Sequence, residues 1–313
     1  MSPRVSVVLA VKDGEDYLAE AIGSVLGQTF RDFELLVVDD GSRDGTPAVL
    51  AAIDDDRLRV LRNETNLGEA PSRNRAVREA RGEYVAILDH DDVALPERLA
   101  REVDVLDRES AVAVVGTWTA LVVDGARVGR VAQRIRTRVD FVHHCLVGDL
   151  QIPHSSTMFR RAAMLELGGY DESLMPSEDF DLLLRFCLAG YGARVIDEEL
   201  VRYRLHERQL SRVHEDRQRA NAAAAHERFL RELAGDLHRL GLSVEEEKEV
   251  QALVEASRRH AARARAWHRL AGFGGVVVRP LARHPALARL RASARRRPLA
   301  RRIYARLLGR DDG

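Results

Sequence analysis

The sequence contains little cysteine, and this limits what can hold the protein together. Only Cys145 and Cys187 occur among 313 residues, too few for the disulfide framework of a small secreted domain. The neighbours of Cys145, His143 and His144, do not have the spacing of a zinc site. We therefore expect a cytosolic chain that is stabilised by a packed core, for which its length is sufficient.

Long apolar runs are also absent. The run Val276–Val278 is far shorter than the roughly 20 apolar residues of a membrane-spanning helix. The N-terminal sequence MSPRVSVVLAVKDGED has neither the apolar region nor the small-residue cleavage site of a secretory leader, so we expect no signal peptide. No GxGxxG motif follows the first apolar run, which argues against a dinucleotide-binding enzyme.

Net charge is absent as well, because 49 Lys and Arg residues balance 49 Asp and Glu residues. The balance hides an asymmetry, since the chain from Arg258 to Arg310 is rich in arginine and almost no acidic residue compensates before Asp311. Such a basic tail suggests contact with something anionic. Nucleic acid is not expected, because no groove-reading motif accompanies the charge. The open alternatives are a peripheral membrane contact, helices packed on the rest of the protein, and a homodimer surface.

What the sequence does contain is a regular alternation of apolar runs and helical patterns. Helical patterns separate the runs, as at Gly68–Ala80, which is closed by Gly82. This alternation predicts an α/β domain with a mostly parallel central sheet. The apolar runs typical of buried strands are Val5–Val11, Glu34–Asp40, Leu58–Leu61 and Tyr84–Leu88.

Farther along the chain the alternation loosens, although Asp179–Leu188 still has a helical pattern. The C-terminal third is rich in Ala, Arg and Glu and is helical by propensity. In it, Ser243 and Glu246 form a capping-box pattern that would begin a helix. We predict a nucleotide-binding α/β domain over residues 1–212 and a helical, Arg-rich region over residues 213–313.

Acidic residues follow two of the predicted strands. Asp39 and Asp40 end the second strand, and the fourth runs into LDHDD, which holds Asp89, Asp91 and Asp92. Ligands of open α/β sheets bind at the carboxyl ends of the strands, and neighbouring carboxylates there can converge on Mg²⁺ or Mn²⁺. The motif therefore indicates a bound metal diphosphate. The alternative for a lone DxD is a solvated acidic turn in which Asp92 caps the next helix.

Six stretches together carry a family resemblance over roughly Val5 to Ser211. In chain order they are VSVVLAVKDGEDYLAEAIGSVLGQTF, FELLVVDDGSRDGT, NETNLGEAPSRNRAVREARGEYVAILDHDD, SSTMFRRAAMLELGGYDESL, SEDFDLLLRFCLAG and VRYRLHERQLS. The sequence thus resembles the inverting glycosyltransferases of family 2, which have the GT-A fold. The resemblance implies transfer of a sugar from a nucleoside diphosphate sugar, expected to be UDP-linked, to a hydroxyl of a glycan or lipid-linked glycan. It also implies Mg²⁺ or Mn²⁺ as cofactor and a role in cell-surface polysaccharide synthesis.

The resemblance assigns nucleotide binding to the ends of the first strands. Asp40 would read the base, with Asp39 beside it, and Arg73 in SRNRA would reach the nucleotide from the following helix. We assign Ala10, near the end of the first strand, to the same site. The alternatives are a turn-forming role for Asp39 and a solvated Arg73. Lys12 departs from the family, since many members have a tyrosine there that packs near the base.

The resemblance also assigns the metal and the chemistry. Asp91 would ligate the metal, Asp89 would bind the ribose or the metal, and His206 in YRLHERQLS would add a contact to the metal or the diphosphate. Glu178 and Asp179 form the family's ED pair, in which Asp179 would be the catalytic base. The alternatives are that the ED pair only caps the following helix and that His206 is an ordinary loop histidine.

Two other functions remain open. One is a catalytically inactive protein that binds nucleotide sugars, against which the joint presence of DHDD, ED and the late histidine argues. The other is a nucleotidyltransferase, an enzyme class that usually has a Gly-rich basic loop after the first strand. This chain has KDGE at residues 12–15, which is too acidic to cradle a triphosphate.

Overall fold

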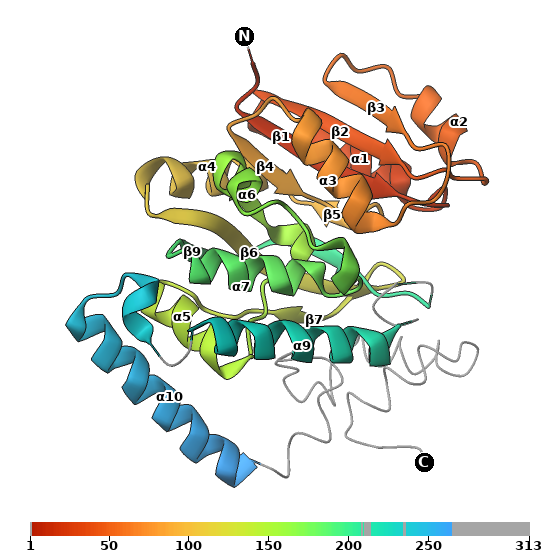
Figure 1. Ribbon diagram of the computed structural model, residues 1–313. Helices are drawn as coiled ribbons and strands as arrows, with labels where there is room; N and C mark the ends of the chain where they lie inside the picture. Colours follow the sequence, from red (N-terminus) through yellow and green to blue (C-terminus); the bar gives the residue numbers. More distant parts are fainter. Residues whose placement is uncertain (1, 208, 210–213, 234–235, 265–313) are drawn as a thin grey trace.

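The computed structural model describes residues 2–207, 209, 214–233 and 236–264 (Figure 1). Their strands form one sheet in the order β3-β2-β1-β4-β8-β6-β9-β5, with β7 paired to β6. The strands are β1 (Val5–Val11), β2 (Phe33–Asp39), β3 (Leu58–Arg62), β4 (Tyr84–Ile87), β5 (Val93–Ala94), β6 (Val112–Val123), β7 (Ala126–Val131), β8 (Met158–Arg160) and β9 (Gly192–Arg204).

The pairings give most of these strands one direction. β3, β2, β1, β4, β6 and β9 run the same way, whereas β8, β7 and β5 run opposite to them. The predicted α/β fold with a mostly parallel sheet is confirmed. The helices are α1 (Leu18–Leu26), α2 (Thr46–Ala51), α3 (Glu69–Glu79), α4 (Arg98–Arg108), α5 (Arg138–Val147), α6 (Arg161–Glu166), α7 (Glu178–Leu188), α9 (Glu215–Leu233) and α10 (Val244–Ala264).

Helices cover both faces of the sheet, and the strand sequences explain why. Successive side chains of a strand point to opposite faces, so an apolar run such as β1 supplies two cores at once. Val8 packs with α3, α5, α6, α7 and α9 on one face. Val7 and Leu9 pack with α1, α2 and α4 on the other. All residues of β1 and β2 are buried, as their continuous hydrophobicity predicts.

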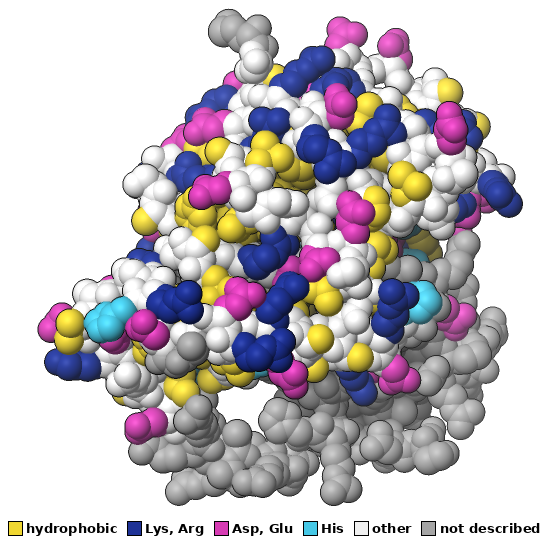
Figure 2. Space-filling view, viewed as in Figure 1, with side chains coloured by type: hydrophobic (Ala, Val, Ile, Leu, Met, Phe, Trp, Pro, Cys, Tyr) yellow, Lys and Arg dark blue, Asp and Glu magenta, His cyan; other side chains and the backbone are white. Residues whose placement is uncertain are grey.

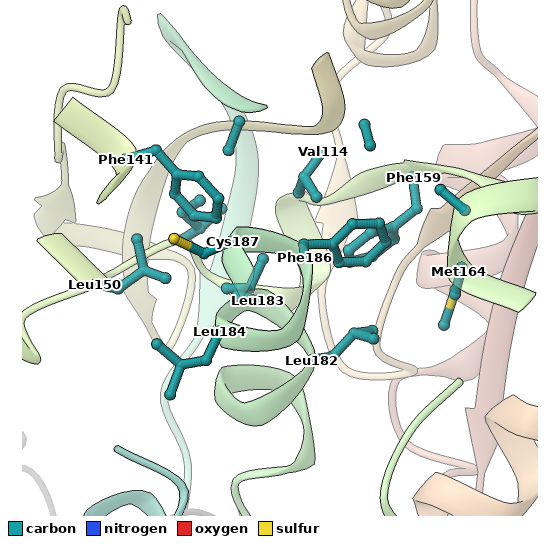
Figure 3. Close-up of a cluster of buried hydrophobic side chains, with 14 of the residues drawn as sticks. Val114, Phe141, Leu150, Phe159, Met164, Leu182, Leu183, Leu184, Phe186 and Cys187 are labelled. Carbon is teal, nitrogen blue, oxygen red and sulfur yellow. The ribbon is translucent and has the colours of Figure 1, made fainter. Parts of the chain in front are cut away.

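Helix α7 lies at the centre of the larger core. Figure 3 shows its side chains reaching to both sides, with Cys187 toward Phe141 and Phe186 beside Phe159. The rings of Phe159 and Phe186 stack with centroids 5.5 Å apart, and neither residue is more than 1% exposed. This packing fixes α7, and with it the residues at the helix N-terminus, relative to the sheet.

The predicted C-terminal helices are present in the described part of that region and pack on the same core. α9 lies along α7, and α10 leads away past α5 (Figure 1). Phe229 and Leu233 of α9 and Val250 of α10 are buried in the larger core. The predicted capping box is also formed, because the Ser243 N–H donates to Glu246 Oε2 over 2.7 Å and the Glu246 N–H donates to Ser243 Oγ over 3.3 Å.

The C-terminal region is described only in part, so some predictions about it are not tested. The boundary at residue 212 stays a prediction, and the arginine-rich tail from residue 265 lies outside the described residues. No helix in the described part of the chain combines the length and the hydrophobicity that a membrane crossing requires. Figure 2 shows basic and acidic side chains interspersed over one face of the molecule.

The sequence patterns missed three of the described strands and α-helices, namely α5, β7 and the two-residue strand β5. α5 begins with a capping box in which the Asp140 N–H donates to Thr137 Oγ1, 3.0 Å away, and Asp140 accepts from the Thr137 N–H. The pattern Thr-x-x-Asp was therefore the available signal. β7 pairs with β6 through a hairpin at Asp124 and Gly125, both of which have positive φ, as tight hairpins require.

We expect Phe186→Ala to lower the free energy of unfolding by about 3–5 kcal/mol, because it leaves a cavity in a closely packed core. Denaturant-induced unfolding measures this change. Leu165→Ala is the control, since Leu165 is 38% exposed, and it should change the free energy by at most about 0.5 kcal/mol. Equal losses for the two variants would contradict the central place of α7 in the core.

Candidate active site

The candidate site lies where β2, β1 and β4, which are neighbours in the sheet, reach their carboxyl ends. At the end of β2, Asp39 is buried, and its Oδ1 accepts from the Ser42 N–H over 2.9 Å. Its Oδ2 is 3.5 Å from Nε of Arg62. Asp39 therefore forms the turn, as one of the two alternatives held. This hydrogen bond does not exclude a contact between Asp39 and a nucleotide. Ala10 of β1 is buried opposite Val38 of β2.

Asp40 organises the loop that leads into α3. Its Oδ1 accepts from Asn63 Nδ2 over 2.8 Å and from the Leu67 N–H over 2.9 Å. Its Oδ2 accepts from the Gly68 N–H over 2.8 Å. Gly68 has φ of +99°, a conformation that favours glycine. The carboxylate therefore has fewer free acceptor positions than a residue devoted to the nucleotide, and its role as base reader stays a prediction.

Arg73 of α3 holds the site together. Its Nη2 is 2.6 Å from Asp89 Oδ1 and 3.0 Å from Glu69 Oε2, and its Nη1 is 3.0 Å from Glu178 Oε1. Only 4% of its side chain is exposed, so the alternative of a solvated Arg73 is wrong. Burial opposes the charge, but the three carboxylates outweigh burial and raise its pKa. Arg73 thus joins the DHDD and ED motifs, which lie far apart in the sequence.

Asp89 is fixed on both sides. Besides its bond with Arg73, its Oδ2 accepts from Ser155 Oγ over 2.8 Å. Burial alone would raise the pKa of Asp89, but the charge of Arg73 and the hydrogen bond from the Ser155 hydroxyl help to lower it to about 2. The carboxylate is therefore ionised at any working pH. His154, which is 2.9 Å from Tyr170 Oη, is kept neutral because burial and Arg73 lower its pKa to about 3.

Asp91 contacts His206, the residue that was predicted to bind the metal together with it. Its Oδ2 lies 2.7 Å from Nε2 of His206, and 12% and 16% of the two side chains are exposed. The alternative of an unrelated loop histidine does not fit this contact. Tyr17 lies beside the His206 ring, with centroids 5.1 Å apart. Asp92 does not cap a helix, because its Oδ1 accepts from the Arg204 N–H over 2.9 Å, so that alternative is also wrong.

These groups fit a hard divalent cation that takes few protein ligands. Asp91 and His206 offer one oxygen and one nitrogen at a partly exposed position, and Oδ2 of Asp92 is buried without a partner. In the described residues, no group of three His, Cys, Asp or Glu side chains could hold a metal by itself. Mg²⁺ commonly completes its shell with water and substrate phosphates, so a two-residue site suits a metal that arrives with a diphosphate.

The ED pair begins α7, with its two members in different surroundings. Glu178 is buried. Its Oε1 accepts from Arg73, and its Oε2 accepts from the Ser177 N–H over 3.0 Å. Asp179 is partly exposed, and its Oδ1 accepts from the Phe180 N–H over 2.8 Å. Surrounding protein and the charge of Glu178 raise the pKa of Asp179 to about 6. Helix capping and a base role are compatible here, since Asp179 stays accessible and titrates near neutral pH.

Sequence reasoning missed two contributors to the site. Glu69 follows the Gly68 turn and forms an ion pair with Arg73. Burial, together with the charges of Asp89 and Glu178, raises the pKa of Glu69 to about 7, although 36% of the Glu69 side chain is exposed. The spacing of Glu69 and Arg73, one helical turn apart, was the available signal. Ser155 lies in a short 3-10 helix, and no pattern pointed to it.

The site as a whole carries excess negative charge. Five acidic residues lie near one another, and Arg73 pairs directly with three of them, Glu69, Asp89 and Glu178. Asp91 and Asp179 are the other two. A diphosphate brought into these surroundings without a cation would meet like charge at close range. The arrangement therefore favours an anionic group that arrives together with a cation, and Asp179 is a partly exposed carboxylate beside it.

Comparisons with known proteins identify the family of this chain. The family model described as Glycosyl transferase family 2 matches residues 6–167. An uncharacterized glycosyltransferase of Methanocaldococcus jannaschii is 31% identical over 217 residues, which cover 67% of this chain and 74% of that protein. The succinoglycan biosynthesis protein ExoO of Rhizobium meliloti is 32% identical over 247 residues, covering 75% and 70%.

Solved structures show the same fold. TarS of S. aureus in complex with UDP-GlcNAc has a TM-score of 0.59 at 21% identity, covering 83% of this chain and 87% of that one. The mannosyltransferase PcManGT of Pyrobaculum calidifontis, in complex with GDP-Man and Mn²⁺, has a TM-score of 0.57 at 20% identity, covering 98% and 86%. The fold predicted from the resemblance is thus confirmed. With the family model matching more than half of its length, this chain belongs to glycosyltransferase family 2.

Proposed function

We propose that this protein is a metal-dependent, inverting glycosyltransferase that moves a sugar from a nucleoside diphosphate sugar to a hydroxyl acceptor. The observation that carries the proposal is the cluster around Arg73. There, Asp89 from the DHDD motif and Glu178 from the ED motif contact one guanidinium, 2.6 Å and 3.0 Å away. The predicted donor-binding residues and the predicted base are thereby held beside one another, as a transfer reaction requires.

The nucleoside diphosphate would lie over the ends of β1 and β2. This position would be bordered by Asp39, Asp40 and Ala10. Arg73 would contribute through its ion pair with Asp89. We favour a UDP-sugar, in line with the family resemblance. TarS was solved with UDP-GlcNAc and the mannosyltransferase with GDP-Man, so relatives of this fold accept both bases, and the test must include both.

Asp91 and His206 would hold Mg²⁺ or Mn²⁺. Such a cation neutralises the charge that develops on the leaving diphosphate. The structure of the mannosyltransferase contains Mn²⁺, which supports a metal in this fold. The protein would hold Asp91 and His206 at a fixed separation for the cation. Arg204 assists, since its side chain donates to the Asp91 carbonyl over 2.9 Å and its N–H donates to Asp92.

Asp179 would accept the proton of the acceptor hydroxyl. That hydroxyl would attack the anomeric carbon from the face opposite the diphosphate, so a single displacement inverts the configuration. A base is most useful when its pKa lies near the working pH, and the pKa of Asp179 is about 6. Glu178 would position the pair through its ion pair with Arg73, 3.0 Å away.

The acceptor would be a glycan or lipid-linked glycan in polysaccharide synthesis. ExoO is named for succinoglycan biosynthesis, which supports this class of product. We further propose a cytoplasmic location at a membrane surface, with the basic tail from residue 265 attracted to anionic lipid. The charge of that tail, read from the sequence, is the support for this part of the proposal.

We expect Asp91→Asn to abolish transfer and to weaken metal-dependent binding of the nucleotide sugar by about 10–100-fold or more. The measurement is thermal stabilisation by UDP-GlcNAc and by GDP-mannose, each with and without Mn²⁺. Asp104→Asn, on the exposed side of α4, is the control and should behave like wild type. Full activity of the wild-type protein in EDTA would rule out metal dependence.

Asp179→Asn should lower turnover by about 10²-fold or more while donor affinity stays close to normal, because a base acts mainly in the transition state. The wild-type rate should rise as pH increases through about 6, where Asp179 loses its proton, and the variant should lack this rise. Turnover and its pH profile check both expectations. Normal turnover by Asp179→Asn would show that the base is another group.

Deletion of residues 276–313 should reduce binding to anionic vesicles and leave hydrolysis of the nucleotide sugar largely intact. The physical reason is that each basic residue near an anionic surface contributes about 1 kcal/mol to binding. Co-sedimentation with phosphatidylglycerol vesicles at low salt measures the effect, with phosphatidylcholine vesicles as control. A full-length protein that ignores anionic vesicles would refute the membrane contact.

A further inference from the structure

The segment that carries the ED pair is held by a helix that follows much later in the sequence. We propose that α9 positions Asp179 for catalysis, with Asn221 as its main positioning residue. This inference rests on the proposed function, in which Asp179 is the base. It assigns a catalytic contribution to a part of the chain beyond residues 6–167, where the family model matches.

Two hydrogen bonds tie the residues just before the ED pair to α9. Asn221 Nδ2 donates to the carbonyl oxygen of Met175 over 2.9 Å. The Ser177 hydroxyl donates to the carbonyl oxygen of Gln218, also over 2.9 Å. Met175 and Ser177 lie three residues and one residue before Glu178, so the backbone that leads into the ED pair is anchored at two points from one helix.

The hydroxyl of Ser177 departs from the usual behaviour of its position. A serine before the first residue of a helix normally accepts from a backbone N–H in the first turn, and the sequence favours that role here. In the structure Ser177 makes no such capping bond, and its hydroxyl turns to α9 instead. Its φ of +145° is rare for a residue with a side chain, and such conformations persist only where the surroundings enforce them.

Arg228 of α9 adds a third contact, which holds the chain both before and after the ED pair. Arg228 of α9 forms ion pairs with Asp171, 3.3 Å away, and with Asp181. Asp181 is buried in the first turn of α7 and also pairs with Arg185, 2.7 Å away. Arg228 lies two helical turns beyond Asn221, so both contacts come from one face of α9.

That face of α9 is itself anchored in the core. Ala225 and Phe229 are 2% and 1% exposed and belong to the same cluster as the buried side chains of α7. The contacts to the catalytic segment are therefore made from a rigid support. Met175 extends the arrangement to the donor side, since its sulfur accepts from the Ala70 N–H of α3 over 3.4 Å, one turn before Arg73.

The consequence for catalysis is positional. Among the described residues, the hydrogen bond found for the Asp179 side chain comes from the Phe180 N–H, so the direction of the side chain depends on the backbone of residues 175–178. A misplacement of a reacting group by about 1 Å can cost about 10²-fold in rate. Loss of one anchor should therefore affect turnover, whereas donor binding, which depends on groups on β1, β2 and α3, should remain.

The test compares Asn221→Ala with Arg217→Ala, an exposed truncation on the same helix. The assay is release of nucleoside diphosphate from UDP-GlcNAc or GDP-mannose with Mn²⁺ in full-length protein, using whichever donor the wild type turns over. Asn221→Ala should lower kcat by about tenfold and leave KM within about twofold, while Arg217→Ala leaves both unchanged. Ser177→Ala should follow Asn221→Ala, and thermal unfolding checks that each variant is folded.

A double-mutant cycle separates positioning from general destabilisation. If Asn221 acts through Asp179, then Asn221→Ala should cost about twofold or less when Asp179 is already asparagine. An equal loss in both backgrounds, or a wild-type kcat for folded Asn221→Ala, would overturn the inference while leaving the base in place. Normal turnover by Asp179→Asn alone would instead refute the proposed base, and the positioning role would fall with it.

Discussion

The buried guanidinium of Arg73 is the interaction on which the candidate site depends. A charge removed from water is tolerated only when partners compensate it, and here Glu69, Asp89 and Glu178 do so from 3.0 Å or less. The partners come from α3, from the turn after β4 and from the start of α7. Removal of the guanidinium would leave three neighbouring carboxylates uncompensated. Arg73 thus joins the turn after β4, where the proposed donor site lies, to the start of α7, which carries the proposed base.

The same cluster explains how neighbouring carboxylates come to differ in proton affinity. Asp89 contacts Arg73 and accepts from Ser155, and its pKa is about 2. Asp179 has no direct partner of opposite charge among its hydrogen bonds, and burial with the charge of Glu178 raises its pKa to about 6. Environments that separate the pKa values of nearby acids are how one site supplies both a permanent anion and a base. Arg73 contributes to this separation because it pairs directly with Asp89 and not with Asp179, whereas burial keeps the pKa of Glu69 raised in spite of its contact with Arg73.

Much of this arrangement could be predicted from the sequence, because it depends on local patterns. The apolar runs gave the strands, and acids at their ends gave Asp39, Asp89 and Asp91 as candidates. The contact between Arg73 and Glu178 could not be predicted, since Glu178 is 105 residues away and only the packing of α7 on the sheet brings it near. The hydroxyl of Ser177 is the opposite case, because a serine just before a helix usually makes a capping bond, and here a contact with α9 takes its place.

The position of α9 bears on how the chain divides into parts. A boundary near residue 212 follows from composition, yet Phe229 and Leu233 of α9 lie in the same core as Phe186 of α7. Burial of such side chains contributes about 1.5–3 kcal/mol each, so α9 and α7 stabilise one another. α7 carries the ED pair on one end and this shared core along its length. The stability of the C-terminal helices and the geometry of the candidate base are therefore coupled through a single helix, and neither region is a passive appendage of the other.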